Sequence, residues 1–409
     1  MESTELYRQI LGITAPWFVE SVEIDHQKTS ITVLLAHATG PGVFRCPKCD
    51  QIAPVYDHHK ARTWRHLDTC QFETFLTAQV PRLNCRACGV LTAQVSWAAP
   101  DGRFTLLFEC FALDILFTAQ VQSRAAQLLR LRPDQVNYLM QRAVERGLER
   151  RDTQRLISHL MVDEKSLQAG HHYVSVLSDG EQGAVLEVVE QRTNEAASEL
   201  LERGLSAAQK AAVKVVTLDM WPPFATAARR QLPDADLVYD RFHLSEHLNA
   251  AVDQTRRQEH KRLSQAGDER LKQTRYLWLR APESLSEQQQ EQLESLCQSE
   301  LETVAAWRLK EEFRAFFDCP SEEAATAFFQ SWYERVKELG NFRLSKVATM
   351  FKEHWSGLIT YLRHHLSNGL AESLNGRIQQ LKSKARGFKS CFGFRRAILF
   401  HLGQLDLYP

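Results

Sequence analysis

Three acidic residues, Asp163, Asp219 and Glu372, occur where a shared metal site would need them. Asp163 follows the apolar run 156–162 and Asp219 follows the run 213–218, so we expect each to leave the end of a buried strand. Glu372 lies at the start of a basic helical segment late in the sequence. Three carboxylates suit a pair of magnesium or manganese ions acting on a phosphodiester bond. An aspartate at a strand end is also commonly a turn former or helix cap. The surrounding sequence has to decide between this structural role and a metal ligand.

The segments around the first two acids alternate between strand and helix patterns. The expected order is strand 156–163, strand 172–177, strand 184–190, helices 195–212, strand 213–219, helix 222–231 and strand 235–239. Pro222 and Pro223 suit a helix N-terminus, which keeps Asp219 at the outlet of its strand. Three linked strands followed by strands alternating with helices describe a ribonuclease H-like α/β sheet. Glu164 would point to the face opposite Asp163 and support the site from behind.

A long helical pattern separates this sheet from the segment that carries Glu372. It runs from Asp240 to about residue 365, which is too long for a loop, and it predicts an all-helical insertion. Aromatic residues at helical spacing would form the core of this insertion: Phe313, Phe316, Phe317, Phe328, Phe329, Trp332 and Tyr333. A base-stacking role for one or two of them is the alternative.

Two Cys-x2-Cys pairs near the N-terminus can supply a closed tetrahedral thiolate site, and they predict a structural zinc ribbon. The predicted zinc ligands are Cys46, Cys49, Cys85 and Cys88. A strand over 74–80 would help fill the long linker between the pairs. The alternative, a redox dithiol, lacks the strand and helix context that such motifs have.

The linker between the two pairs also contains polar residues that could serve DNA. Cys70, His58, His59 and His66 could contribute to the metal site, although solvated or DNA-facing positions fit the histidines better. The basic stretch 58–66 reads as a loop that would either follow phosphates or simply lie in solvent.

A helical segment follows from about 104 to 151, with a buried face expected at Phe108, Phe111, Ala112, Ile115 and Leu116. Within it, a first helix capped by Ser123 and a second opened by Pro133 and Asp134 resemble a helix-turn-helix. The side chains expected to face a DNA groove are Gln135, Asn137, Gln141 and Arg142. A small helical connector is the alternative reading.

A long segment with charges of a single sign occurs only near the C-terminus. Between Glu372 and Asp406 the charged residues are basic, and we expect them to contact DNA phosphates: Arg377, Lys382, Lys384, Arg386, Lys389, Arg395 and Arg396. A solvated helix face would interleave both signs.

Length and composition limit the number of domains, the kind of partner and the cellular location. The 409 residues predict two or three domains. A formal net charge of zero argues against a uniformly basic coat and leaves local patches as the electrostatic footprint. The absence of an apolar run of ~20 residues and the acidic N-terminal start predict a cytoplasmic protein without a membrane partner. Nine cysteines in such a chain indicate thiols and metal binding before disulfides.

Together these segments resemble the ISL-three-type bacterial insertion-sequence transposases. The resemblance rests on the two cysteine pairs and on 162–166, 217–221, 239–243 and 367–372, which occur in the family's order over nearly the whole chain. It implies an α+β multidomain protein with a zinc-binding domain (1–100), a helix-turn-helix domain (101–152), a ribonuclease H-like core (153–245), an all-helical insertion (246–365) and the rest of the core (366–409).

The resemblance also implies an activity. Such an enzyme binds the terminal inverted repeats of its element, cuts double-stranded DNA there, and joins the freed 3′ ends to target DNA, acting as a homodimer near the nucleoid. Asp163, Asp219 and Glu372 would be the DDE ligands of two metal ions. Asp240 and His243 match an Asp-x2-His signature, in which His243 orders DNA near the scissile phosphate, although it could instead cap the following helix.

Two rival functions remain at this point. The chain could be a DNA-binding regulator that no longer cuts, although three intact acids argue against this. It could also be a repair nuclease of the same fold, since a fold alone does not fix a function. An inverted repeat flanking the coding sequence would separate the transposase from both.

Overall fold

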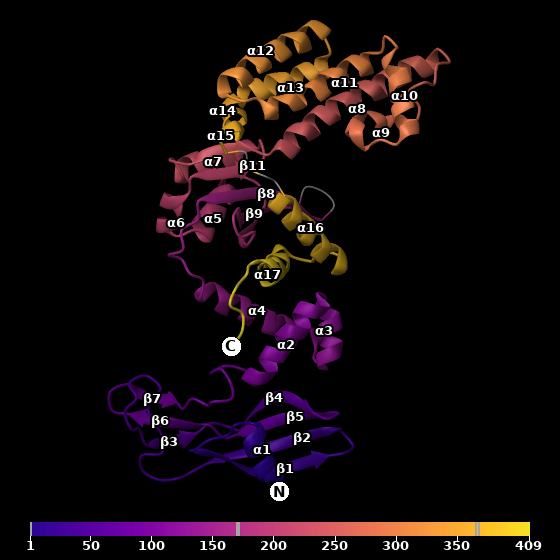
Figure 1. The fold of residues 1–409 in the computed structure, drawn as a ribbon. Helices are drawn as coiled ribbons and strands as arrows, with labels where there is room; N and C mark the ends of the chain where they lie inside the picture. Colours follow the sequence, from indigo (N-terminus) through magenta and orange to yellow (C-terminus); the bar gives the residue numbers. More distant parts are fainter. Residues whose placement is uncertain (1, 169–171, 365, 367–368) are drawn as a thin grey trace. The chain divides into compact units, whose positions relative to one another are not determined.

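The chain forms two compact units, seen here in a computed structural model that describes residues 2–168, 172–364, 366 and 369–409 (Figure 1). The first unit is Met1–Arg151 together with Leu405–Pro409, and the second is Asp152–Gln404. Within the described residues, no helix is both long and apolar enough to cross a membrane. The division into the five segments 1–100, 101–152, 153–245, 246–365 and 366–409, which was expected from the sequence, stays a prediction.

The first unit begins with a helix and two small sheets. Its elements are α1 (Ser3–Ile10), β1 (Trp17–Asp25), β2 (Ser30–His37), β3 (Val55–His58), β4 (Arg62–Thr69), β5 (Phe72–Ala78), β6 (Pro81–Cys85) and β7 (Gly89–Thr92). One sheet has the order β1-β2-β5-β4, with β2 and β5 parallel, and the other has the antiparallel order β3-β6-β7. Strand β5 confirms the strand expected over 74–80.

Strand β4 corrects the interpretation of residues 58–66 as a basic loop. Trp64, Arg65 and His66 are all buried, because β4 pairs with β5 on one side and with the segment before α2 on the other. The ring nitrogen Nδ1 of His66 lies 2.8 Å from the Thr105 hydroxyl. Burial lowers the pKa of His66 to about 4, so its ring is neutral at pH 7. His66 is therefore neither solvated nor DNA-facing.

Three helices follow: α2 (Leu106–Ala119), α3 (Gln122–Leu129) and α4 (Pro133–Glu149). They confirm the helical segment, and Pro133 begins α4 as predicted. Ser123 is not the cap of α3, because the helix already begins at Gln122 and its N-cap residue is Val121. Phe111 points to solvent with 45% of its surface exposed, although it was expected in the buried face.

The last residues of the chain pack in the first unit, against α2 and α4. Leu407 is 1% exposed, and its carbonyl oxygen accepts a hydrogen bond from Arg146 at 2.7 Å. The hydroxyl of Tyr408 donates to Asp114 at 2.6 Å. A Cβ atom on Gly147 would lie 2.6 Å from the Cβ of Leu405, so only glycine allows this approach. The tail 405–409 is thus an integral part of this unit.

The second unit is built on a five-stranded sheet. Its elements up to the insertion are β8 (His159–Gln168), β9 (His172–Asp179), β10 (Val185–Glu190), α5 (Asn194–Gly204), α6 (Ala207–Ala212), β11 (Val215–Leu218), α7 (Pro222–Gln231) and β12 (Asp236–Tyr239). The strand order is β10-β9-β8-β11-β12, in which β8, β11 and β12 are parallel. In Figure 1, α5, α6 and α7 lie on one side of the strands and α16 (Gly369–Lys384) lies on the other.

Strand β8 is longer than predicted. It continues through Asp163 to Gln168, because its antiparallel pairing with β9 extends from Leu160 to Gln168. Only its parallel pairing with β11 ends near Asp163, at Val162 opposite Leu218. Asp163 therefore lies inside a strand whose neighbour on one side has ended, and not at the end of the strand itself.

The helical insertion is confirmed in the described residues. It consists of α8 (Arg241–Gln265), α9 (Arg275–Leu279), α10 (Glu287–Cys297), α11 (Glu302–Glu312), α12 (Glu322–Leu339), α13 (Phe342–Glu353), α14 (Trp355–Ile359), α15 (Tyr361–His364) and two 3₁₀ turns, η1 (Pro282–Ser284) and η2 (Phe313–Asp318). The ring centroids of Phe313 and Trp332 lie 4.7 Å apart in its core. Phe313, Phe316, Phe317, Phe329 and Trp332 are buried, and Phe328 and Tyr333 are partly buried.

One hydrophobic core joins the sheet to the insertion. Tyr239, the last residue of β12, is 2% exposed, and its hydroxyl lies 3.2 Å from Nδ1 of His354. Its ring packs on Gly357 of α14 so closely that a Cβ atom there would lie 2.2 Å from the ring. Because Asp240 directly follows Tyr239, this contact also fixes the position of that carboxylate.

We predict that Gly357→Ala lowers the free energy of unfolding by about 1–3 kcal/mol, because the added methyl group overpacks the Tyr239 ring. Denaturant unfolding of the full chain measures the change. Gly376→Ala in α16 is the matched control, since nothing lies within 4 Å of its added methyl group. The control should leave stability unchanged or raise it by roughly 0.5–1 kcal/mol, because alanine favours a helix. Equal effects of both substitutions would contradict the packing argument.

Candidate functional site

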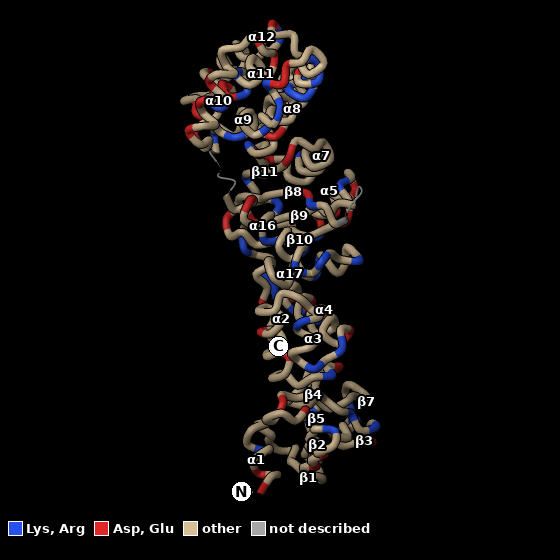
Figure 2. Tube along the Cα trace, turned by 90° about the vertical axis from the view of Figure 1, so that its right-hand side faces the viewer, with Lys and Arg blue, Asp and Glu red and all other residues tan. Residues whose placement is uncertain are grey.

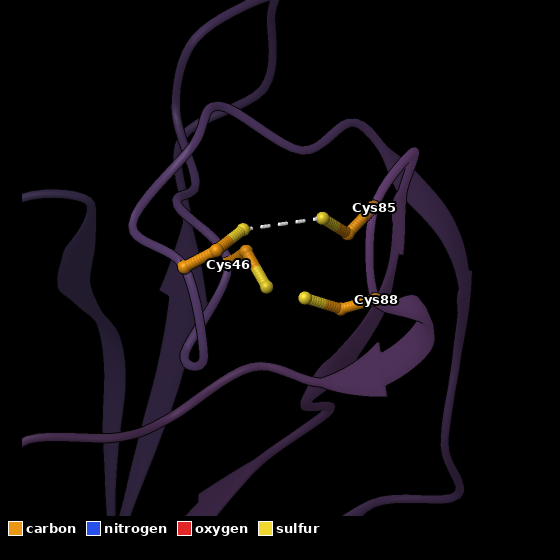
Figure 3. A group of neighbouring side chains, drawn as sticks. Cys46, Cys85 and Cys88 are labelled. Atoms are coloured by element: carbon orange, nitrogen blue, oxygen red, sulfur yellow. Dashed lines mark hydrogen bonds between the residues drawn. The ribbon is translucent and has the colours of Figure 1, made fainter.

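Four thiols meet in the first unit. The Sγ atoms of Cys46, Cys49, Cys85 and Cys88 all lie within 4.8 Å of one another, and those of Cys49 and Cys85 are 3.5 Å apart. Figure 3 shows the labelled side chains pointing toward a common centre. Four thiolates around a tetrahedral zinc ion at about 2.3 Å would be about 3.8 Å apart, so the cluster fits zinc. Cys70 lies outside it.

The local backbone explains why the thiols converge. The residue after each pair, Asp50 or Gly89, has a positive φ of 56° or 79°, which turns the chain back under the second cysteine. The backbone N–H of Asp50 donates to the carbonyl of Cys46 at 2.9 Å, closing the first turn. The N–H of Lys48 donates to the Cys46 sulfur, and this contact is the largest cause that lowers the pKa of that thiol. The pKa values of Cys49 and Cys88 are raised by their neighbouring thiols and by burial, so the first turn favours the thiolate form at Cys46 alone.

Three carboxylates follow the same row of the parallel strands in the second unit. Leu218 of β11 is paired with Val162 of β8 on one side and with Tyr239 of β12 on the other. The next residues along the three strands are Asp163, Asp219 and Asp240. Adjacent strands are about 4.8 Å apart, so register alone brings the three acids together.

Each of the three carboxylates accepts one short backbone hydrogen bond. Asp163 accepts from Glu164, Asp219 accepts from Met220, and Asp240 accepts from Phe242, at 2.7, 2.6 and 2.7 Å. These bonds fix one oxygen of each group. The other oxygen of Asp163 pairs with Lys165 Nζ at 3.0 Å.

Burial raises the pKa of Asp240, and the negative charges of Asp163 and Asp219 add to this increase. Asp240 also caps α8, and Nε2 of His243 lies 4.0 Å from its carboxylate. One turn further along α8, the pKa of His247 is lowered, because the effect of burial exceeds the opposite effect of the negative charge of Asp219. The row of acids and the first two turns of α8 therefore form one electrostatic site.

An arginine supports the back of this site. Arg192 donates to both carboxylate oxygens of Glu164, at 2.8 and 3.0 Å. Its guanidinium lies over the rings of Tyr173 and Trp221, 4.2 and 4.6 Å from their centroids. The Trp221 indole N–H donates to the Arg192 carbonyl at 2.8 Å. This cluster ties the residue after Asp163 to the segment that follows Asp219.

Glu372 lies exposed in the first turn of α16. This helix runs beside β8, since Lys382 donates to the Ser166 carbonyl at 2.7 Å (Figure 1). Ser367 and Asn368, part of the predicted motif before it, lie outside the described residues. Within the described residues, no three carboxylates approach one another as closely as the four thiols do.

The residues predicted on α4 do not all face solvent. Gln135 uses its side-chain oxygen to accept the backbone N–H of Arg132 at 2.9 Å, in a capping box. Its side-chain oxygen therefore stabilises the helix start, and a groove-facing role for this residue stays a prediction. Asn137 is exposed, and Gln141 and Arg142 are half-buried.

The basic residues near the C-terminus divide into two groups. Arg395 makes a bidentate ion pair with Glu187 of β10, at 2.6 and 2.8 Å, and Arg396 is 4% exposed. Both belong to α17 (Cys391–Leu402), which packs on β10, so they hold the fold and do not reach phosphates as predicted. Lys384, Arg386, Lys389 and Arg377 are exposed. Figure 2 shows that acidic and basic residues are interspersed along most of the chain, in keeping with zero net charge.

Sequence reasoning missed three contributors to the site: Lys165, Arg192 and His247. The signal for His247 was present, because His243 and His247 are four residues apart and share one face of a helix. Nothing local identifies Arg192, whose partners lie on β8, on β9 and after β11.

Comparison with known proteins identifies the family. The family model DDE_Tnp_ISL3, described as a transposase, matches residues 160–398. A second model, described as the zinc-finger of transposase IS204/IS1001/IS1096/IS1165, matches residues 42–88. The two models thus cover the acid row with its helical insertion, and the four-thiol cluster.

Curated relatives align over most of their length. The transposase for insertion sequence element IS1557 of Mycobacterium tuberculosis is 27% identical over 419 residues, covering 95% of this chain and 93% of that protein. The transposase for IS1001 of Bordetella parapertussis is 25% identical, covering 85% and 86%. A solved structure, the Drosophila P element transposase strand transfer complex, matches 73% of this chain and 93% of that one at 11% identity, with a TM-score of 0.37. Because the first family model spans more than half of the sequence, the chain belongs to the ISL3 family of DDE transposases, enzymes that cut DNA and transfer its strands.

Proposed function

We propose that Asp163, Asp219 and Glu372 bind two divalent metal ions, and that Asp240 and His243 assist them. The observation that carries this proposal is the register of β8, β11 and β12, which puts Asp163, Asp219 and Asp240 in one row. The strand order β10-β9-β8-β11-β12 supports a ribonuclease H-like core. Two ions about 3.5–4 Å apart need carboxylates spread over more than one strand, which suits the row.

The chain's own groups have distinct tasks in this proposal. Two Mg²⁺ or Mn²⁺ ions, when bound, activate water or a 3′ hydroxyl and stabilise the leaving oxygen of an in-line displacement. Asp163 and Asp219 each keep one oxygen fixed by a backbone N–H. The second oxygen of Asp219 would bind a metal ion directly, and that of Asp163 would exchange its ion pair with Lys165 for the metal. Glu372 is carried by the first turn of α16, and in this proposal it is the third ligand of the metal ions. Glu164 and Arg192 hold β8 against the segment after Asp219, which preserves the spacing of the ligands.

For DNA recognition, we propose that α3 and α4 act as a helix-turn-helix that reads the terminal inverted repeats. Their support is a three-residue connection, 130–132, and a second helix that presents Asn137, Gln141 and Arg142. Strand transfer joins two ends of an element, so we propose that a homodimer holds both ends together. Target DNA would reach the same acids after cleavage.

We predict that Asp219→Asn abolishes magnesium-dependent nicking and joining of a labelled duplex that bears the terminal repeat, while affinity for this duplex stays within about twofold. The reason is that the substitution removes a metal ligand and leaves unit 1, where the repeat is read, unchanged. Mn²⁺ binding followed by electron paramagnetic resonance should weaken in parallel.

Asp234→Asn is the matched control for that experiment, because Asp234 is an exposed acid in the turn before β12. It should retain both cleavage and Mn²⁺ binding. If wild-type protein binds the duplex but does not cleave it with any divalent ion, the regulator becomes the better explanation. If it cleaves duplexes regardless of the repeat, the repair nuclease does.

We predict that Cys88→Ser removes the zinc that purified wild-type protein carries at about one ion per chain, and that residues 1–100 then become sensitive to protease. Structural zinc contributes roughly 10–16 kcal/mol of binding energy to the fold that it closes, so its loss should unfold this segment. Zinc content by mass spectrometry and limited proteolysis measure the two effects.

Cys70→Ser is the control for zinc, because Cys70 is exposed in the β4–β5 turn and lies outside the cluster. It should keep its zinc and its protease resistance. Zinc retained in the Cys88 variant, or lost in the Cys70 variant, would show that a different set of ligands binds the ion.

We predict that the double substitution Asn137→Ala, Gln141→Ala reduces the preference for the terminal repeat over random duplex by about 10-fold or more. Each lost base contact costs about 1–3 kcal/mol of discrimination, whereas phosphate contacts are unaffected. Competition binding at fixed salt measures the ratio. Gln298→Ala, an exposed glutamine of the other unit, is the control and should leave the ratio unchanged. An unchanged ratio in the double variant would favour a helical connector.

A further inference from the structure

A groove in the helical insertion has no role in the site described so far. It lies between α8 and α13 and has a volume of about 950 Å³. Small or short side chains, Ala250, Ala251 and Ser345, form part of its lining. The other lining residues are His247, Gln254, Lys337, Phe342, Arg343, Lys346, Val347, Thr349, Met350 and Glu353.

One end of the groove lies on the helix that begins at the row of acids. His247 of α8 lines the groove. His247 is the seventh residue of α8, and this helix begins directly after Asp240. The groove therefore leads from the proposed metal site along α8 into the insertion.

The groove is rich in cations that the protein does not neutralise. In the described part of the chain, Arg343 and Lys346 form no ion pair, and Lys337 reaches only the Thr349 hydroxyl, at 3.3 Å, and the Tyr333 ring. Glu353 is the one acid among the lining residues. Several other arginines of the insertion are paired, namely Arg256 with Asp253, Arg262 with Glu259, Arg314 with Glu283 and Arg335 with Glu312. Arg241 and Arg280 lie over aromatic rings, and Arg308 donates to the Cys297 carbonyl.

Unpaired cations along an open groove fit a polyanion. Phosphates of a DNA backbone would supply the missing partners, and counterion release would favour their binding. The flexible lysine and arginine side chains of the groove can contact phosphates. The alanine and serine side chains beside them are too short to recognise bases. Such a groove accepts DNA of any sequence.

We propose that the groove between α8 and α13 binds the donor DNA that flanks the element, next to the scissile phosphate. This proposal rests on the proposed function of the acid row. The flank differs from one insertion to the next, so its binding surface has to be independent of sequence, whereas the element's end has a fixed sequence. Helix α8 begins directly after Asp240 and carries His247 two turns later, so the groove starts on the same helix that leaves the acid row.

Phe342 stands at the lip of the groove and offers a direct probe. It is the first residue of α13, and 78% of its surface is exposed. An aromatic ring next to Arg343 would contact sugars or bases of DNA in the groove. Replacing it with a photoreactive aromatic residue of similar shape should therefore report contact.

The first test compares two labelled duplexes, one ending flush with the terminal repeat and one with 15 added base pairs of flank. With wild-type protein, the flank should increase affinity. In the full-length variant Arg343→Glu, Lys346→Glu, we expect affinity for the flanked duplex to fall at least 10-fold, and affinity for the flush duplex to be unchanged. The control variant Arg270→Glu, Lys272→Glu makes the same charge change at exposed residues between α8 and α9, outside the groove, and should behave as wild type.

The second test places p-benzoylphenylalanine at Phe342 and, as a control, at Tyr276 of α9, which is 56% exposed. We expect crosslinks from position 342 to flank nucleotides and none from position 276.

Two results would overturn the assignment to flank. In one, the variant Arg343→Glu, Lys346→Glu binds both duplexes equally weakly. In the other, its defect is confined to capture of target DNA by precleaved ends. Because both tests measure binding, they remain informative if Asp219→Asn fails to abolish cleavage, an outcome that would contradict only the metal site.

Discussion

The register of the parallel strands β8, β11 and β12 is the constraint on which the catalytic unit depends. Val162, Leu218 and Tyr239 are buried in one row. The next residue after each is an aspartate, so packing this row places the three aspartates next to one another. A slip of one residue would send each aspartate to the opposite face of the sheet and bury a charge. The buried side chains thus select the register, and the register gathers the acids.

The remaining parts of this unit stabilise the same row from several directions. Gly357 in the insertion allows Tyr239 to pack, and the shared hydrophobic core makes the insertion part of the sheet's support. Arg192, placed between two aromatic rings, ties Glu164 to the segment after Asp219. In the first unit, Cys46 and Cys85 are part of the buried core, so the four-thiol cluster is packed against the same apolar side chains that hold its two sheets.

Local patterns predicted the local features of this protein well. The cysteine pairs, the strands around Asp219 and the start of α4 at Pro133 were all evident from spacing and composition. Features that depend on distant partners were not. Strand β8 passes Asp163 because β9 continues to pair with it, and Arg395 is half-buried because Glu187 of β10 pairs with it. His66 looked like part of a basic loop until β5 and Thr105 covered it. The positions of the metal-ligand candidates were predictable from the sequence, but the burial of their basic neighbours was not.

The tail 405–409 has a consequence for how the protein is made. Leu407 and Tyr408 complete the packing of α2 and α4, yet they are translated only after all residues of the second unit. The packing of α2 and α4, the second of which is proposed to read DNA, therefore stays incomplete while the acid row and the insertion are synthesised. A nascent or truncated chain would lack a finished first unit, so full assembly of the DNA-reading helices is coupled to completion of the catalytic unit during synthesis.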